Sequence, residues 1–285
     1  MAGKAKTANR KAKDSVFNDL FTIPKYKYQL FMQLHPEATD IKETDIEIVT
    51  LEHVLMNNEY NDLGLLAGDH FLILAEAQST WSVNILLRFL LYLAATYSDY
   101  IDKKKLSLYG SKRVEIPKPE LYLIYSGNKG KKPDVLSFSE EFFGGEETAV
   151  EVKAKVIYGN SKKKDLLSQY IAYCNVLDKQ VKLYGRNKKA VEETIRICSD
   201  KNILKEYLEA HRKEVVEIMT QIYNKQRELN IYVAEKERDA EKEAQIKIAE
   251  KMIAKDMPDN DIVELTGLAL KEVKSLRKAK VRKKR

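Results

Sequence analysis

The spacing of apolar and polar positions along the chain predicts an α/β sheet domain followed by a helical part. Helical spacing follows Asp14, recurs at 28–34 and 85–101, and continues from residue 165 almost to the end. Strand patterns occupy 46–51, 121–125 and 150–158, and a hairpin lies within 61–80. The sheet is therefore expected in the first 160 residues, with helices beyond it.

Pattern and composition together predict five segments. They are a Lys/Ala-rich basic arm expected to be disordered (1–13), an α/β core (14–160), a helical extension (161–233), a charged helix or linker (234–256) and a helix-turn-helix-like unit with a basic tail (257–285). In the last segment Gly267 is the expected turn. Across that turn, one apolar set is expected to pack against another: Ile262, Val263 and Leu265 against Leu270, Val273 and Leu276.

Positive charge is concentrated at the two ends of the chain. The net charge is +7, but residues 1–13 carry +5 and residues 271–285 carry +8, which leaves −6 for residues 14–270. This positive charge suggests a nucleic-acid or membrane partner, and the two basic ends are expected to be arms on an acidic body. The expected phosphate contacts lie on one basic helical face, formed by Lys271, Lys274, Arg277 and Lys278. A helical hairpin that makes a homo-oligomer is the alternative for this unit.

The two cysteines and the apolar stretches bear on the compartment. Cys174 and Cys198 lie in apolar, helical contexts and are expected to be buried thiols, with a disulfide as the alternative. The longest apolar stretch, 85–95, is interrupted by Arg88 and is too short to span a bilayer. No apolar segment follows the basic N-terminus, so a signal peptide is not expected. We expect a soluble, cytoplasmic protein without a membrane partner.

The hairpin NDLGLLAGDHFLILAEAQST carries the candidate chemistry. Glu76 and Gln78 project from one face of its second strand, because side chains alternate along a strand. A two-residue turn would pair Asp62 with Ala75, on the wrong face, whereas a three-residue loop or a bulge would bring Asp62 beside Glu76. Two carboxylates and the carbonyl of Ala77 would then form an oxygen site typical of Mg²⁺. A polar hairpin end that faces solvent is the alternative.

A family resemblance supports the metal-site interpretation. It rests on segments in the order DSVFNDLF, YNDLGLLAG, FLILAEAQSTWSVNILLRFLLYLAATY, PELYLIYSGNKGKKPDVLSFSEEFF and KAVEETIRICSDKNILKEYLEAHRKEV. These segments resemble the family of recombination-promoting nucleases and transposase-like proteins, within the PD-(D/E)XK nuclease superfamily. The resemblance covers nearly the whole chain beyond the N-terminal arm. Its most specific part is the E-x-Q strand followed by the helix of Arg88 and Tyr92.

The resemblance implies a restriction-endonuclease-like mixed sheet flanked by helices, and an Mg²⁺-dependent endodeoxyribonuclease connected with recombination or mobile DNA. Asp62 and Glu76 match the metal-binding acids, with the Ala77 carbonyl as a further ligand. Gln78 stands where most of the superfamily has lysine; it supplies no charge and can orient a water by hydrogen bonding. Mn²⁺ and Ca²⁺ are alternative metals. The alternative function is a catalytically silent DNA-binding or interaction protein that keeps the fold.

Further side chains have two interpretations each. Arg88 and Tyr92, one helical turn apart, could contact phosphate in the cleft or pack beneath the sheet. Asp14 resembles the family's first-helix acid and is an accessory candidate, with a helix N-cap as the alternative. Trp81 could stack on a base or pack in the core.

Overall fold

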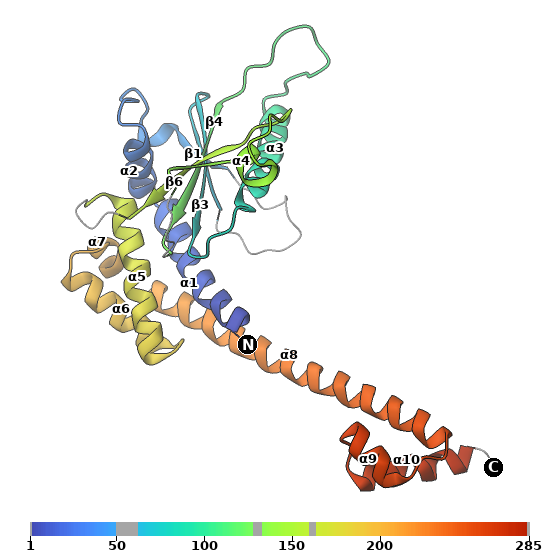
Figure 1. Ribbon diagram of the computed structural model, residues 1–285. Helices are drawn as coiled ribbons and strands as arrows, with labels where there is room; N and C mark the ends of the chain where they lie inside the picture. The colour runs from blue at the N-terminus through green and yellow to red at the C-terminus, as the bar shows by residue number, and fades with distance from the viewer. Residues whose placement is uncertain (1, 50–61, 128–132, 160–163, 284–285) are drawn as a thin grey trace. The chain divides into compact units, whose positions relative to one another are not determined.

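The structure is a computed structural model that describes residues 2–49, 62–127, 133–159 and 164–283 (Figure 1). Side chains are described for 12–49, 63–127, 133–159 and 164–279. The chain divides into two compact units, Met1–Asn224 and Lys225–Arg285. The first unit is an α/β domain, and the regular elements of the second are helices throughout its described residues.

A mixed sheet of six strands, counted over the described residues, forms the centre of the first unit. Its spatial order is β1 (Ile46–Val49), β2 (Asp62–Ala67), β3 (Phe71–Gln78), β4 (Lys118–Tyr125), β6 (Lys153–Tyr158) and β5 (Val135–Ser137). The pairs β1–β2, β2–β3 and β5–β6 are antiparallel, whereas β3–β4 and β4–β6 are parallel. The predicted α/β class and mixed sheet are confirmed. Residues 50 and 51 of the first predicted strand lie outside the described residues.

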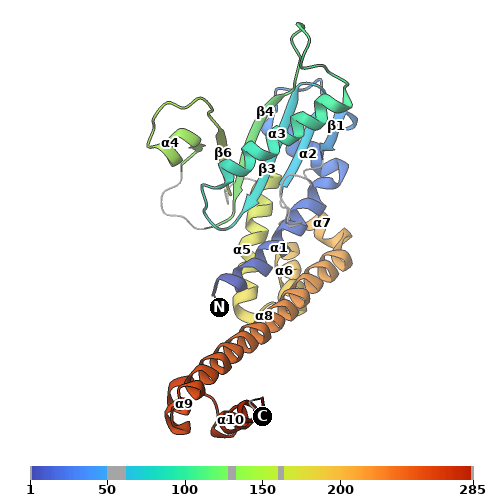
Figure 2. The same ribbon diagram turned by 90° about the vertical axis from the view of Figure 1, so that its right-hand side faces the viewer.

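Helices cover both faces of this sheet (Figures 1 and 2). One face packs against α1 (Ala2–Thr22), α2 (Pro24–Leu34) and α5 (Leu166–Tyr184). The other packs against α3 (Ile85–Lys103), with α4 (Phe138–Phe143) at its side. The helices α6 (Lys188–Asp200), α7 (Lys205–Ala210) and the start of α8 (Arg212–Ala254) extend the first cluster. A short 3₁₀ helix, η1 (Glu43–Asp45), precedes β1.

The N-terminal helix corrects two predictions. It begins at Ala2 rather than near Asp14, so most of the arm expected to be disordered is helical. Alanine and lysine favour helix, and no proline or glycine interrupts residues 4–22. Asp14 is consequently a buried residue inside the helix and not its N-cap. The side chains of residues 1–11 lie outside those that the structure describes.

The cysteines agree with their prediction. Cys174 on α5 and Cys198 on α6 are both free and buried. Burial raises the pKa of the Cys174 thiol to about 11. At neutral pH both thiols are therefore protonated apolar groups of the core.

The second unit packs α9 (Asp259–Thr266) and α10 (Leu270–Lys283) on the end of α8. Gly267, with φ +71°, ends α9 as predicted and donates its N–H to the Val263 carbonyl at 2.9 Å. Ile262 and Val273 are core residues, but Leu265 and Leu270 are 63% and 40% exposed, so their predicted packing is wrong.

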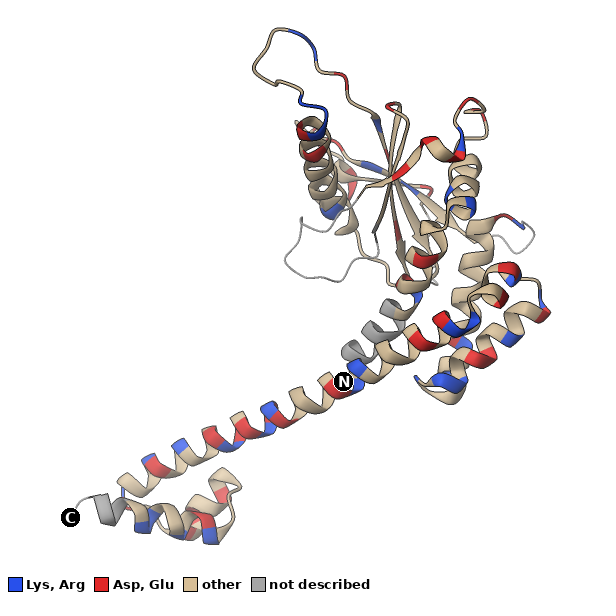
Figure 3. Ribbon diagram, turned by 180° about the vertical axis from the view of Figure 1, so that it is seen from behind, with Lys and Arg blue, Asp and Glu red and all other residues tan. Residues whose placement is uncertain are grey.

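The reason for that difference is the contribution of α8. Its residues Ala249 and Ile253 pack beside Ile262 of α9 and Val273 of α10. The predicted packing had only α9 and α10 facing each other, without α8. The segment predicted as a charged helix or linker is helical, and residues 234–244 are exposed, with both signs of charge alternating along it (Figure 3). The second compact unit begins at Lys225, and the end of α8 belongs to its core.

Candidate functional site

The register of the β2–β3 hairpin brings the two predicted acidic positions together. Ala67 pairs with Phe71, which leaves a three-residue loop of Gly68, Asp69 and His70. Counting back along the strands, Asp62 pairs with Glu76. The odd loop required by the metal-site interpretation is therefore present, and the prediction of the register is confirmed. The side chain of Asp62 lies outside those that the structure describes.

Glu76 and Gln78 face α3. They alternate with Ala75 and Ala77, which pack on the opposite face, so Ala77 could serve the site only through its backbone carbonyl. The carboxylate of Glu76 lies at the end of a buried strand whose earlier residues are apolar. Glu76 is 2% exposed and Gln78 is 6% exposed. Both polar groups are thus held in a largely apolar environment, where charge must be balanced.

Arg88, in the first turn of α3, supplies that balance. Its Nη2 lies 2.5 Å from Oε1 of Glu76 and 3.5 Å from Oε1 of Gln78. Gln78 in turn donates its amide N–H to the carbonyl of Thr80. One guanidinium therefore joins both strand-end residues, which agrees with the packing interpretation of Arg88. Its side chain retains 30% exposure, so it is also within reach of solvent.

The two aromatic candidates are packing residues in this structure. Tyr92 is 2% exposed and belongs to the cluster between α3 and the sheet. Trp81 packs edge-on against Tyr125, with ring centroids 5.1 Å apart. Tyr92 is thus buried, whereas Trp81 is only partly buried.

The oxygen donors fit a hard cation only in part. Among the side chains that the structure describes, no group of three or more His, Cys, Asp or Glu is arranged to hold a metal ion. Glu76 supplies a carboxylate and Gln78 an amide oxygen, the ligand types that Mg²⁺ accepts. Arg88 already contacts both, so a metal ion and this guanidinium would compete for the same oxygens.

Asp14 lies beside α5, within the cluster on the sheet face opposite Glu76. Burial, the Cys174 thiol and the charge of Asp14 together raise the pKa of Tyr170. The accessory role of Asp14, as the holder of a second cation or a water, stays a prediction.

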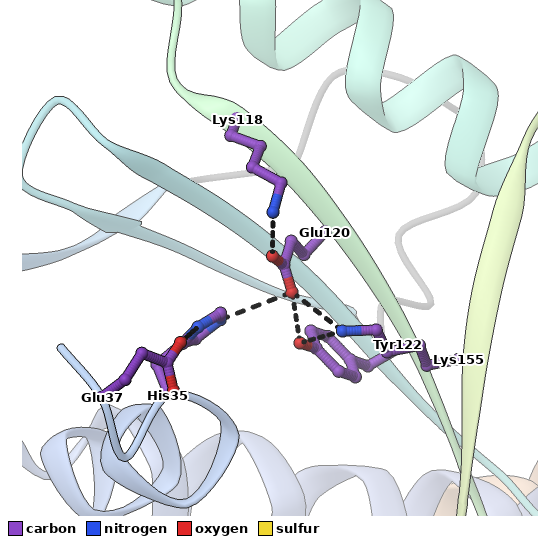
Figure 4. A network of polar contacts seen from close by, with 6 residues as sticks. All are labelled: His35, Glu37, Lys118, Glu120, Tyr122 and Lys155. Carbon is purple, nitrogen blue, oxygen red and sulfur yellow. Dashed lines mark hydrogen bonds and ion pairs between the residues drawn. The ribbon is translucent and has the colours of Figure 1, made fainter.

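A second polar network, around Glu120 on β4, was not predicted (Figure 4). Its carboxylate is nearly buried and accepts hydrogen bonds from Tyr122 at 2.5 Å, Lys118 at 3.0 Å and Lys155 at 3.3 Å. Burial alone would raise the pKa of Glu120, but the bonds from Tyr122 and Lys118 and the charges of Lys155 and His35 outweigh it and lower this pKa to about 2. Glu120 is therefore ionised at all physiological pH values.

His35, just after α2, connects this network to the helical layer. Its ring packs between Phe31 and Phe71, at centroid distances of 5.3 and 4.5 Å. Nε2 lies 3.4 Å from Glu120 and Nδ1 lies 3.0 Å from Glu37. The sequence signal that could have revealed the network is the pair Glu120 and Tyr122, polar groups at alternate positions on the buried face of a strand.

The basic face of the second unit separates into two kinds of residue. Lys271, Lys274 and Lys278 are exposed, as the predicted phosphate contacts require. Arg277 instead donates to Asp259 at 2.8 Å and to the carbonyl of Met257 at 2.5 Å. It therefore ties α10 to the start of α9, which is a structural role.

Comparisons with models of protein families, with curated proteins and with solved structures find no match for this chain. The resemblance to recombination-promoting nucleases stays a prediction from the sequence. Independently of that resemblance, the chain has an α/β domain, with a six-stranded mixed sheet in its described part, followed by a helical unit.

Within the described residues, every helix is too short or too polar to cross a membrane.

Proposed function

We propose that the chain is a metal-dependent endodeoxyribonuclease that acts in recombination or on mobile DNA, with Asp62, Glu76 and Gln78 as its catalytic residues. The observation that carries the proposal is the hairpin register, in which Asp62 pairs with Glu76. Gln78 follows two residues later on the same face. Two acids opposite each other at a strand end are a costly arrangement unless a cation balances them.

In the proposed reaction, Asp62, Glu76 and the carbonyl of Ala77 hold the metal, and Gln78 orients the attacking water. Mg²⁺ is the expected ion, with Mn²⁺ or Ca²⁺ as alternatives. When bound, the ion lowers the pKa of water and balances charge on the phosphate. The amide of Gln78 carries no charge, so its contribution is limited to a hydrogen bond.

Arg88 has two successive roles in this proposal. Without metal, its guanidinium balances Glu76 across 2.5 Å. A metal ion at Glu76 would release the guanidinium, which is suited to bind a phosphate through two parallel N–H donors. The exposed lysines of α10 would add sequence-independent attraction to DNA.

The test is plasmid cleavage with Mg²⁺, Mn²⁺ or Ca²⁺. Asp62→Asn should lower the cleavage rate by about a hundredfold or more, because it removes a charged ligand. Asp40→Asn is the matched control, since Asp40 is an exposed acid before η1 that makes no ion pair within the described residues; its rate should stay within about twofold of wild type. Equal cleavage by wild type and Asp62→Asn would refute the proposed site.

The second candidate is a catalytically silent DNA-binding protein that keeps this fold. It is favoured by one observation, the ion pair of Arg88 with Glu76, which already balances the carboxylate. Calorimetric titration with Mg²⁺ separates the two candidates. The nuclease proposal requires heat of binding that disappears in Glu76→Gln, whereas the silent protein would give none in either variant.

A further inference from the structure

A basic loop joins α3 to β4. The segment 103–118 carries six basic side chains and one acidic one, which gives it a net charge of +5. The basic residues are Lys103, Lys104, Lys105, Lys112, Arg113 and Lys118. The body from 14 to 270 carries −6, so its remaining residues sum to −11. The loop is therefore a concentrated positive region on an acidic domain (Figure 3).

Backbone and side-chain hydrogen bonds fix both ends of this loop. At its start, the N–H of Leu106 donates to the carbonyl of Ile101 at 2.9 Å. At its end, the hydroxyl of Tyr97 donates to the carbonyl of Pro117 at 2.7 Å, and the N–H of Lys118 donates to the carbonyl of His70 at 2.8 Å. Both ends of the loop are thus anchored, the first to α3 and the second to α3 and the hairpin.

The loop, the hairpin loop and Tyr100 line an open hollow of about 790 Å³. Asp69 lies at its edge and binds Lys104 at 2.9 Å and the hydroxyl of Tyr100 at 3.1 Å. This acid is therefore already neutralised. Lys105, Lys112 and Arg113 are exposed and make no ion pair within the described part of the chain. Glu115, an exposed acid, also lines the hollow, so five basic residues (Lys104, Lys105, Lys112, Arg113 and Lys118) face two acids (Asp69 and Glu115) and the lining keeps a net charge of +3.

We propose that this loop binds the phosphate backbone of a nucleic acid. Arg113 can bind a phosphate through two N–H donors, and Lys105 and Lys112 add point charges beside it. Tyr109, near the tip, is fully exposed and offers a ring on which an unpaired base can stack. Because the charges border a hollow rather than a flat face, a narrow strand fits them better than a lipid surface.

This surface is separate from the proposed metal site. Lys118 pairs with Phe71 at the start of β3. Glu76 lies five residues further along that strand, about 17 Å away at roughly 3.3 Å per residue. The inference therefore does not depend on cleavage, and it can be tested in EDTA, where no metal-dependent reaction occurs.

The test compares two charge reversals in the full chain. Lys112→Glu with Arg113→Glu changes the loop, and Lys182→Glu with Arg186→Glu is the matched control, an exposed lysine and arginine near the end of α5. Both lower the net charge by the same amount. Fluorescence anisotropy measures Kd for a labelled duplex and a labelled single strand, at increasing NaCl concentration.

The loop variant should weaken binding at least about tenfold and lower the slope of log Kd against log salt by about 2, because two phosphate contacts are lost. The control should stay within about twofold of wild type. As a local measurement, bound DNA should protect Lys105 and Lys112, but not Lys182, from acetylation detected by mass spectrometry.

Two outcomes would overturn the inference. In the first, the loop variant and the control bind DNA equally well and DNA protects neither loop lysine, so the phosphate contacts lie elsewhere. In the second, the loop variant loses binding to vesicles of phosphatidylserine and phosphatidylcholine while its binding to DNA is unchanged, which would make the loop a lipid-binding element. Lys112→Gln with Arg113→Gln, which only removes charge, should give a smaller effect in the same direction.

Discussion

At the residue scale, the contact between Arg88 and Glu76 links the stability of the domain to its proposed chemistry. The carboxylate is buried at the end of β3, and the guanidinium reaches it from the first turn of α3. A charge that has lost its partner in such a place costs more than the intact pair contributes. The pair is therefore expected to make the sheet sensitive to the loss of either member.

We expect Arg88→Met to lower the free energy of unfolding by about 2 kcal/mol, because Glu76 loses its countercharge. Arg113→Met is the control, since Arg113 is exposed and lies in the loop before β4; it should change stability by less than about 0.5 kcal/mol. Urea unfolding measures both. Adding Glu76→Gln to Arg88→Met should recover part of the loss, and additive effects of the two substitutions would argue against coupling.

The carboxylate of Glu120 predicts a pH dependence of stability. Its folded pKa of about 2 lies below the ordinary value of 4.5, so its ionised form favours folding. This contribution is complete above pH 4.5 and is lost as the pH falls toward 2. Glu120→Gln should therefore reduce stability at pH 7 by about 2 kcal/mol, because several donors lose a charged acceptor.

Unfolding of wild type and Glu120→Gln at pH 7, 4 and 3 checks this prediction. The difference between the two proteins should shrink steadily as the pH is lowered. Lys155→Met, which removes one exposed partner of Glu120 at 3.3 Å, should give a smaller change of the same sign. A difference that is constant from pH 7 to pH 3 would mean that the charge of Glu120 does not contribute.

At the element scale, the β2–β3 hairpin determines which residues meet at the candidate site. Its three-residue loop contains Gly68 with φ +54°, a left-handed conformation that glycine adopts without strain. The loop length fixes the register, and a change of one residue would move every side chain of a strand to the other face. The pairing of Asp62 with Glu76 depends on this turn.

Gly68→Ala should therefore destabilise the protein by about 1 kcal/mol, the cost of a left-handed conformation for an L-residue. Gly110→Ala is the matched control, because Gly110 has no positive φ and a Cβ there would meet nothing within 4 Å. The control should be neutral or slightly stabilising. Thermal melts of the two variants give the comparison; equal melting temperatures would show that the turn tolerates a side chain.

At the scale of the whole molecule, the structure changes how the two basic ends can be tested. Lys13 is buried and pairs with Asp178 at 2.7 Å, and Val273 of α10 is a core residue. Removing residues 1–13 or 271–285 would therefore disrupt packing as well as charge. Neutral substitutions of exposed lysines are the appropriate change.

We predict that replacing Lys271, Lys274 and Lys278 with glutamine lowers the salt slope of DNA binding by up to about 3, since each lost phosphate contact removes about 0.9 from the slope. Stability should be unchanged, because all three side chains are exposed. Arg277→Gln should do the reverse: it should lower the melting temperature, because the bond to Asp259 is lost, and leave the slope nearly unchanged. Anisotropy titrations and thermal melts distinguish these results.

The sequence by itself determined the features that depend on neighbouring residues. Apolar periodicity located the long helix α3 and every strand of the described sheet except the short β5, and Gly267 marked the end of α9. The alternation of side chains along β3 put Glu76 and Gln78 on one face. Asp62 could join them on that face only if the hairpin had a three-residue loop or a bulge, and the three-residue loop is observed. These are local properties of the backbone, so a local pattern predicts them.

Only the tertiary structure decided which partners meet. The contact of Arg88 with Glu76 requires α3 to fold back on the end of β3, and the network of Glu120 joins α2, β4 and β6. The core of the second unit likewise needs Ala249 and Ile253 from α8, and this left Leu265 and Leu270 exposed. Such contacts join residues far apart in the chain, and their free energies depend on burial and charge that exist only once the elements pack.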